Sequence, residues 1–329
     1  MAGNKQQGKR AKGEYNARQS SRQDIAQRIA CRSFGILYGM PLALKIVYAM
    51  SIKPMPLSKH LGLVFLLAVL LSCSQQATVP DPGSTNAPSA PAVSGTWWRP
   101  TPGTNWQIQY SGPLDTSLAV QVYDLDLVDT DLKTIELLHA AGRKVLCYFS
   151  AGSYEEWRSD AGQFPAATLG KPLEGWPGER WLDVRQISSL APIMTARLDL
   201  AAQKKCDGVD PDNVDGYSND SGFLLKPEDQ LAYNRWLAAE AHKRGLAVGL
   251  KNDLDQIPQL VGDFDFAVNE QCFYYKECEK LLPFIQANKP VWGIEYQGDS
   301  SSFCPQANQH NFDTLKKKME LDAWRESCR

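Results

Sequence analysis

Histidine is scarce in this chain, and its scarcity argues against one large class of enzymes. Only four histidines occur in 329 residues, and no two cysteines have the CxxC spacing. Zinc sites are built mainly from histidine and cysteine side chains at short spacings. We therefore expect no metal site and no cofactor, and metal-dependent hydrolysis is disfavoured.

Two other ligand-binding motifs are also missing. No glycine-rich phosphate loop follows any predicted strand, which weakens an open doubly wound sheet as the fold. The acidic run CDGVDPDNVDGY, residues 206–217, does not fit a calcium loop. Counted from Asp210, the fifth position is Val214 and the twelfth is Ser221, where glutamate is expected. The four aspartates of this run therefore need another explanation.

No apolar run near the N-terminus is long enough to span a membrane. The longest, LGLVFLLAVLLSC at 61–73, follows basic residues and ends in LLSC, which resembles a bacterial lipoprotein box. We expect a lipoprotein signal peptide over residues 50–72 and lipidation of Cys73. Residues 1–49 would then be an extension upstream of the true start at Met50 or Met55, or alternatively a basic cytoplasmic arm.

The segment after the signal predicts a tether followed by one folded domain. Residues 73–95 are rich in Ser, Pro, Ala and Gly and lack apolar periodicity, which is typical of a flexible linker. Eleven Lys and Arg but two Asp and Glu precede Cys73, so the remainder holds 24 basic and 35 acidic residues. An acidic domain over 96–329 would repel nucleic acid and attract cationic substrates.

Cysteine usage agrees with export. Six cysteines fall within the predicted domain, and an even number in an exported domain suggests up to three disulfides. We favour Cys272 with Cys278 by proximity, and Cys304 with Cys328 as a staple on the C-terminal tail. The expected protein is a monomeric lipoprotein, anchored to the membrane on its extracytoplasmic side or at the cell surface.

Short apolar runs alternate with helical segments through the domain. The junctions LLHAAGRKVLCYFSAG and AEAHKRGLAVGLKND each pass from a helix end through glycine into a strand. His139 and His242 suit the last helical turn as capping residues, and Gly142 and Gly245 suit the left-handed position after it. Pro227 is placed to begin the second of these helices.

Eight apolar runs predict strands. Strands interleaved with helices in this way favour a parallel (β/α)8 barrel of the TIM type, in which functional groups gather at the carboxyl ends of the strands. The runs are WQIQY, VQVYDLD, KVLCYFS, RWLDV, DGVDPDNVD, LAVGLKND, DFAVNEQC and PVWGIEY.

A barrel explains the acidic run. Alternate residues of a strand share one face, so Gly208, Asp210 and Asp212 would point one way and Val209 and Pro211 the other. The aspartates would then line the barrel mouth, where mutual repulsion should raise at least one pKa. Clusters of this kind are more often functional than structural, although a solvated turn is the alternative.

A second carboxylate, Glu270, ends the strand of DFAVNEQC and should face the same mouth. Two carboxylates across a cleft suit glycoside hydrolysis, in which one protonates the leaving oxygen and the other acts as nucleophile or base. The alternative is a glutamate paired with a neighbouring lysine. Other strand ends offer groups for binding a sugar: Asp124, Asp126, Tyr148, Ser150, Asp210, Asp215, Lys251, Asn252, Glu295 and Tyr296, with Tyr154, Trp157, Trp176 and Trp181 nearby.

Several of these motifs occur together in one order. CYFSAGSYEEWR, DGVDPDNVDGY, GLKND, NEQCFYYKEC and VWGIEY resemble the glycoside hydrolase family 114 domain, the endo-α-1,4-polygalactosaminidase family, from Trp97 to about Tyr296. The resemblance implies a barrel enzyme that cleaves α-1,4-linked galactosamine polymers. It also implies that Asp212 and Glu270 are the catalytic acids.

Alternatives remain for both residues and function. Asp210 or Asp215 could replace Asp212 if the strand end is misplaced by one turn, and the roles of nucleophile and acid could be reversed. The rival functions are a noncatalytic polysaccharide-binding surface lipoprotein and a hydrolase for another amino sugar or an α-galactoside.

Overall fold

The computed structural model of the chain describes residues 96–329. The predicted extension, signal peptide, lipidation site at Cys73 and tether lie outside the described residues. Within the described part, no helix has both the length and the apolar character needed to cross a membrane.

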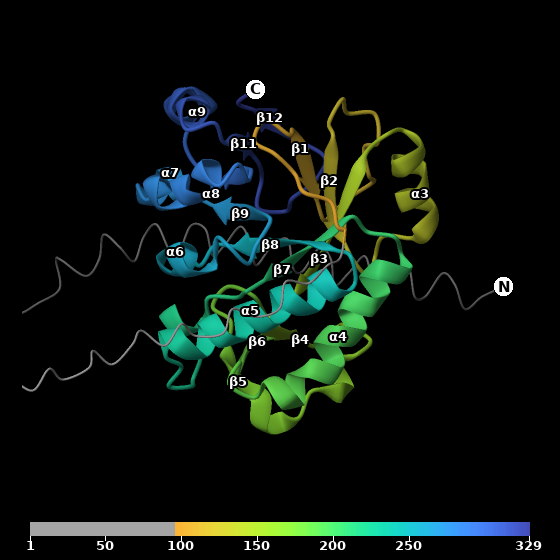
Figure 1. Ribbon diagram of the computed structural model, residues 1–329, viewed down its shortest axis with the longest axis vertical. Coiled ribbons are helices and arrows are strands. Elements are labelled where there is room, and N and C mark those ends of the chain that lie inside the picture. The colour runs from red at the N-terminus through yellow and green to blue at the C-terminus, as the bar shows by residue number, and fades with distance from the viewer. Residues whose placement is uncertain (1–95) are drawn as a thin grey trace, which may run out of the picture. The chain divides into compact units, whose positions relative to one another are not determined.

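Eight parallel strands form one curled sheet, with a short antiparallel strand at its last edge. Most of the loops between them carry helices, which flank the sheet in Figure 1. The predicted α/β barrel class is thereby confirmed. In sheet order the strands are β1 (Trp106–Gln109), β2 (Val122–Asp126), β3 (Lys144–Ser150), β7 (Gly208–Asp212), β8 (Ala247–Lys251), β9 (Phe266–Glu270), β10 (Val291–Glu295), β11 (Asp313–Lys316) and β12 (Glu326–Ser327).

Long helices connect the strands in the first half, and shorter helices do so in the second. The α-helices are α3 (Leu132–Ala140), α4 (Ile187–Gln203), α5 (Pro227–Lys243), α6 (Ile257–Leu260), α7 (Cys272–Tyr275), α8 (Leu282–Gln286) and α9 (Ser300–Gln309). Short 3-10 turns are Ala161–Gln163, Ala166–Thr168, Gly216–Ser218, Leu254–Gln256 and Cys278–Leu281.

The helix boundaries follow the predicted chemistry. α5 begins at Pro227. After α3 and α5, Gly142 and Gly245 have φ angles of +74° and +72°, in the left-handed region that glycine adopts without steric cost. His139 and His242 lie in the last turns of these helices, as expected.

Both histidines have a second role that the sequence did not indicate. Nε2 of His139 lies 2.8 Å from an oxygen of Asp207, and His242 makes the same contact with Asp265. Each aspartate directly precedes a strand and also accepts a hydrogen bond from a backbone N–H of the neighbouring strand, that of Val145 or Val248. One aspartate of the acidic run, Asp207, is thus structural and ties a helix end to two strands.

One predicted barrel strand belongs elsewhere, which corrects the strand assignment. RWLDV contributes β6 (Glu179–Leu182), which pairs antiparallel with β4 (Ser153–Glu155) and β5 (Leu169–Pro172) in a separate three-stranded sheet. This small sheet is an excursion between β3 and α4. The eighth parallel strand is instead β11, which the sequence analysis did not identify.

The two faces of the strands carry different cores. Inward side chains such as Trp106, Leu146 and Phe266 form one apolar cluster, whereas outward ones such as Val209 pack with the helices. Val209 thus points outward, as the alternation predicted for the acidic run requires. At Gly249, an added Cβ would lie 2.2 Å from the inward Phe266 ring, so no larger side chain fits there.

Strands β1 and β11 meet without ladder pairing, and other hydrogen bonds join them. The indole of Trp106 on β1 donates to the carbonyl oxygen of Asp313 on β11 at 3.0 Å. The backbone N–H of Tyr110, just after β1, donates to the carbonyl oxygen of Leu321 at 2.9 Å. The C-terminal tail thus closes the barrel.

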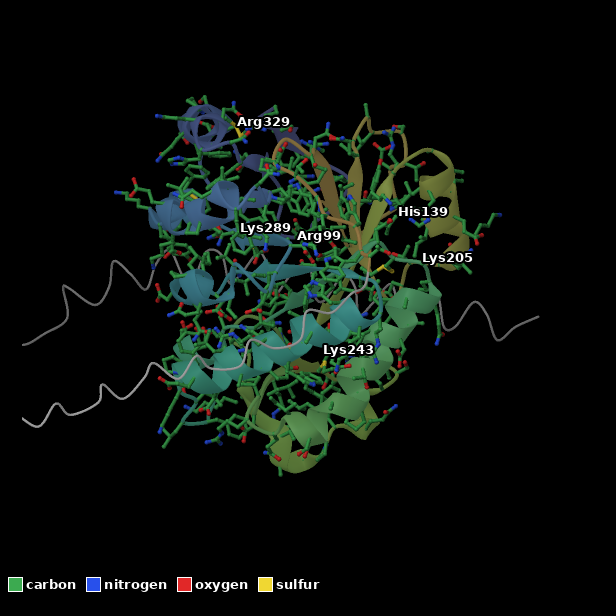
Figure 2. The ribbon with its side chains drawn as sticks, in the orientation of Figure 1. Arg99, His139, Lys205, Lys243, Lys289 and Arg329 are labelled. Carbon is green, nitrogen blue, oxygen red and sulfur yellow. A yellow bond between two sulfur atoms is a disulfide. The ribbon has the colours of Figure 1, made fainter. Side chains whose placement is uncertain are left out.

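Three disulfides hold the domain. Cys272–Cys278 and Cys304–Cys328 form as predicted, and Cys147–Cys206 is a third pair that had not been assigned. Figure 2 shows Arg329 beside α9, where Cys304–Cys328 secures the tail. Three disulfides are typical of a protein that matures outside the reducing cytosol.

Candidate active site

Polar side chains replace the apolar ones at the carboxyl end of the barrel. Along the barrel strands, the inward side chains are apolar at first and become charged or hydroxyl-bearing toward the carboxyl end. Examples are Leu146 followed by Tyr148 on β3, and Val268 followed by Glu270 on β9. Because the strands are parallel, these groups converge at one mouth.

A cavity opens at this mouth. It contains seven acidic and two basic side chains, and its negative balance suits a cationic ligand. Its lining residues are Tyr110, Ser111, Asp126, Asp129, Tyr148, Glu155, Trp157, Arg158, Trp176, Glu179, Asp212, Lys251, Glu270, Tyr296, Met319, Glu320 and Leu321.

Asp212 and Glu270 share one lysine. Nζ of Lys251 lies 3.1 Å from Oδ1 of Asp212 and 3.7 Å from Oε2 of Glu270. The lysine side chain is 4% exposed, whereas those of Asp212 and Glu270 are 18% and 28% exposed. The carboxylates can therefore meet a ligand, while the buried ammonium holds them from below.

The pKa of Lys251 reflects this position. Burial alone would lower it, but the nearby negative charges, led by Asp212 and Glu270, raise it well above its usual value. The lysine is therefore a permanent cation in the site and cannot serve as a base near neutral pH.

The two carboxylates have different hydrogen-bond donors. Asp212 accepts from the Tyr148 hydroxyl at 3.0 Å and from the backbone N–H of Asn213 at 2.8 Å, in addition to Lys251. Glu270 accepts a short hydrogen bond from the Tyr296 hydroxyl. Asp212 therefore receives more hydrogen bonds than Glu270.

The chain turns sharply after β7, β8 and β9, the strands that carry the two carboxylates and their shared lysine. Asn213, Asn252 and Gln271 directly follow Asp212, Lys251 and Glu270, and their φ angles are +61°, +52° and +65°. Asparagine tolerates the left-handed region better than most residues, whereas glutamine there is uncommon. Backbone strain of this kind gathers at functional sites, and it ends each strand at the residue that enters the cavity.

Asn252 holds the neighbouring strand in place. Its Oδ1 accepts from the backbone N–H of Glu270 at 3.0 Å and from the side-chain amide of Asn269 at 3.2 Å. Asn252 and Asp215 line a second cavity, which shares Glu270 with the first. In this environment burial, with the charge of Asp212, raises the pKa of Asp215 to about 6.

Four predicted binding residues line neither cavity. Asp124, Ser150 and Asp210 are 0% exposed. Ser150 bonds to the Ser153 hydroxyl at 2.6 Å. Glu295 accepts a hydrogen bond from the backbone N–H of Phe273 in α7, and burial raises the pKa of Glu295 to about 7.

The small antiparallel sheet and its loops build one wall. Trp157 and Trp176 line the cavity, and they are two of the four aromatic residues singled out. Arg158 makes paired hydrogen bonds to Asp126 at 3.0 and 2.7 Å and also contacts Glu155. Asp126, a predicted binding residue, therefore reaches the cavity but already has a cation partner.

Several cavity residues were not foreseen. Tyr110 follows β1 at the same inward position as the other mouth residues, so strand alternation could have identified it. Met319, Glu320 and Leu321 come from the C-terminal tail, where no periodic pattern signals a contact with the mouth. Within residues 96–329, no group of three or more His, Cys, Asp or Glu side chains is arranged to hold a metal ion.

Comparisons with known proteins agree with this geometry. The model of glycoside-hydrolase family GH114 matches residues 87–329. The crystal structure of Aspergillus fumigatus Ega3 in complex with galactosamine is 44% identical with a TM-score of 0.68, and the match covers 71% of this chain and 98% of that one. No curated protein sequence is significantly similar to this chain.

A more distant structure shows the same fold. The glycoside hydrolase domain of PelA from Pseudomonas aeruginosa is 14% identical with a TM-score of 0.55, covering 68% of this chain and 98% of that one. The family match also includes the tail beyond Tyr296, which the sequence resemblance had left out. The chain therefore belongs to glycoside-hydrolase family GH114 and is a glycoside hydrolase.

Proposed function

We propose that this enzyme hydrolyses α-1,4-linked polysaccharide that contains galactosamine, and that Asp212 and Glu270 perform the reaction. The observation that carries this proposal is the placement of both carboxylates in one cavity, on either side of Lys251. The similarity to a structure that binds galactosamine, at 44% identity, supports the sugar. An amino sugar with a free amine is a cation, which suits the acidic lining.

The different surroundings of the two carboxylates suggest their roles. Three donors converge on Asp212 and stabilise its negative charge, as a nucleophile requires. Glu270 is the more exposed of the two, and its smaller number of donors leaves it freer to exchange a proton with the leaving oxygen. We therefore assign Asp212 as nucleophile and Glu270 as acid and base.

The shared lysine favours retention of configuration. One oxygen of each carboxylate lies within 3.1 or 3.7 Å of the same ammonium. These two oxygens could reach the separation of inverting enzymes, about 6.5 Å or more, only if the two contacts made a wide angle at the ammonium nitrogen. The shorter separation of retaining enzymes, about 5 to 5.5 Å, is reached at a smaller angle.

Product analysis tests this function. The purified protein would be incubated with partly deacetylated α-1,4-galactosaminan, and released oligomers would be identified by mass spectrometry. We expect products from the wild type and from Glu279→Gln, an exposed control outside both cavities, but none from Glu270→Gln. Binding without products from the wild type would favour a noncatalytic polysaccharide-binding protein, and activity only on other polymers would favour a different substrate.

We also propose that the protein is exported and anchored through Cys73 as a monomer. The three disulfides support an oxidising compartment. Metabolic labelling with a fatty acid should mark the full chain and not Cys73→Ser. Light scattering of the detergent-free Cys73→Ser protein should give the mass of one chain, and a larger mass would contradict the monomer.

A further inference from the structure

Two further carboxyl groups lie directly beneath the cavity. Asp124 on β2 and Asp210 on β7 are both 0% exposed, and neither lines the cavity. Their strands are separated only by β3, whose Tyr148 pairs in register with Asp210. Each carboxyl group acts directly on the charge of the other.

This carboxyl pair, Asp124 with Asp210, lacks donors. Both oxygens of Asp124 and Oδ1 of Asp210 receive no hydrogen bond from any residue in the described part of the chain. The Tyr110 hydroxyl donates to Oδ2 of Asp210, but at 3.5 Å this is a long contact. A buried carboxylate without donors is costly, and two adjacent ones are more so.

A proton shared within the pair resolves both problems. The protonated carboxyl donates to its neighbour, which supplies the missing donor and removes one of two adjacent negative charges. Burial raises the pKa of Asp124 well above its usual range and that of Asp210 to about 7. Both directions agree with the geometry: the pair resists full ionisation.

The charged groups around the pair connect it to the catalytic residues. From β8, Lys251 attracts both carboxyl groups. From β7 and β9, Asp212 and Glu270 repel Asp210. Since the same ammonium lies within 4 Å of Asp212 and Glu270, a fully ionised pair would compete with them for Lys251.

We propose that Asp124 and Asp210 are positioning residues that share at least one proton at neutral pH, and that this proton keeps Lys251 on Asp212 and Glu270. The proposal rests on the catalytic roles proposed above. No bond to the substrate is made by the pair, and its proton stays between the two carboxyl groups.

Infrared spectroscopy tests the proton without any substrate. The C=O stretch of a protonated carboxyl would be measured near pH 7 in the wild type and in the double variant Asp124→Asn with Asp210→Asn. Other buried acids such as Asp253 and Glu295 contribute to both spectra and cancel in the difference. We expect a band that only the wild type shows, and an unchanged spectrum would overturn the proposal.

Kinetics of two substitutions at one position test the positioning role. Asparagine at 210 can donate to Asp124 as a protonated carboxyl does, whereas leucine of similar size cannot. We expect Asp210→Asn to keep kcat within about tenfold of the wild type. Asp210→Leu should lose about 100-fold in kcat, the effect of misplacing catalytic groups by about 1 Å.

Other kinetic outcomes would refute the pair. If Asp210→Asn is as inactive as Asp210→Leu while both remain folded by circular dichroism, the site needs a charge at 210 rather than a shared proton. If Asp210→Leu is as active as Asp210→Asn, no positioning role exists. A wild type without hydrolytic activity would contradict the proposed function. The infrared measurement would still test the shared proton, because it requires no activity.

Discussion

The Cys147–Cys206 disulfide should stabilise the domain more than the other two, because it closes the longest loop. Its cysteines are 59 residues apart, against 6 for Cys272–Cys278. In the chain-entropy model, a loop of that length restricts the unfolded chain by about 4 kcal/mol, and the short loop by about 2 kcal/mol. Removing the first disulfide should therefore cost about 2 kcal/mol more than removing the second.

The two disulfides are comparably buried, so differences in burial do not confound the comparison of their stabilities. All four cysteines are at most 6% exposed, so replacing either pair by alanine removes similar packing. Urea unfolding of the two double-alanine variants, followed by circular dichroism, gives the free energy of unfolding of each. Equal losses in the two variants, or a larger loss for the Cys272–Cys278 variant, would refute the entropic reasoning.

Three other changes should have measurable effects. Gly249→Ala would place a methyl group 2.2 Å from the Phe266 ring, so thermal unfolding should show a loss of about 1 to 3 kcal/mol, and an unchanged midpoint would contradict the packing. Tyr296→Phe removes the hydroxyl that donates to Glu270, and kcat on the polymer should fall about tenfold or more; an unchanged kcat would deny that bond a catalytic role. Burial raises the pKa of Glu295 from 4.5 to about 7, so between those pH values the unfolded chain releases a proton that the folded chain retains. Stability should therefore fall as pH rises through this window, and Glu295→Gln should lose less than the wild type in urea unfolding at pH 5 and pH 7.

Strand positions at the site could be predicted because burial and chemistry follow the same two-residue period. β8 and β9 each read as a largely apolar run that ends in a charged inward residue, Lys251 or Glu270, and β7 alternates outward and inward residues up to Asp212. The structure places these three in one cavity. Asp124 and Asp210 follow the same pattern but lie one layer deeper, and depth along a barrel axis is not encoded in alternation alone.

The missed elements depend on partners far away in sequence. β11, with the sequence DTLK, contains one apolar residue, and it becomes a strand because β10 pairs with it and Trp106 bonds to it. RWLDV is apolar enough for a barrel strand, yet its antiparallel neighbours place it in the small sheet. Likewise, the Cys147–Cys206 pair follows from the register of β3 beside β7.

The closure of the barrel by its tail has a consequence for the order of folding. Trp106 and Asp313, which join the first and last parallel strands, are 207 residues apart. During synthesis β1 therefore emerges long before the strand and tail that cover its open edge. An uncovered strand edge is prone to pair with other chains, so nascent chains that stop short of β11 should aggregate and depend on chaperones until the last strand is made.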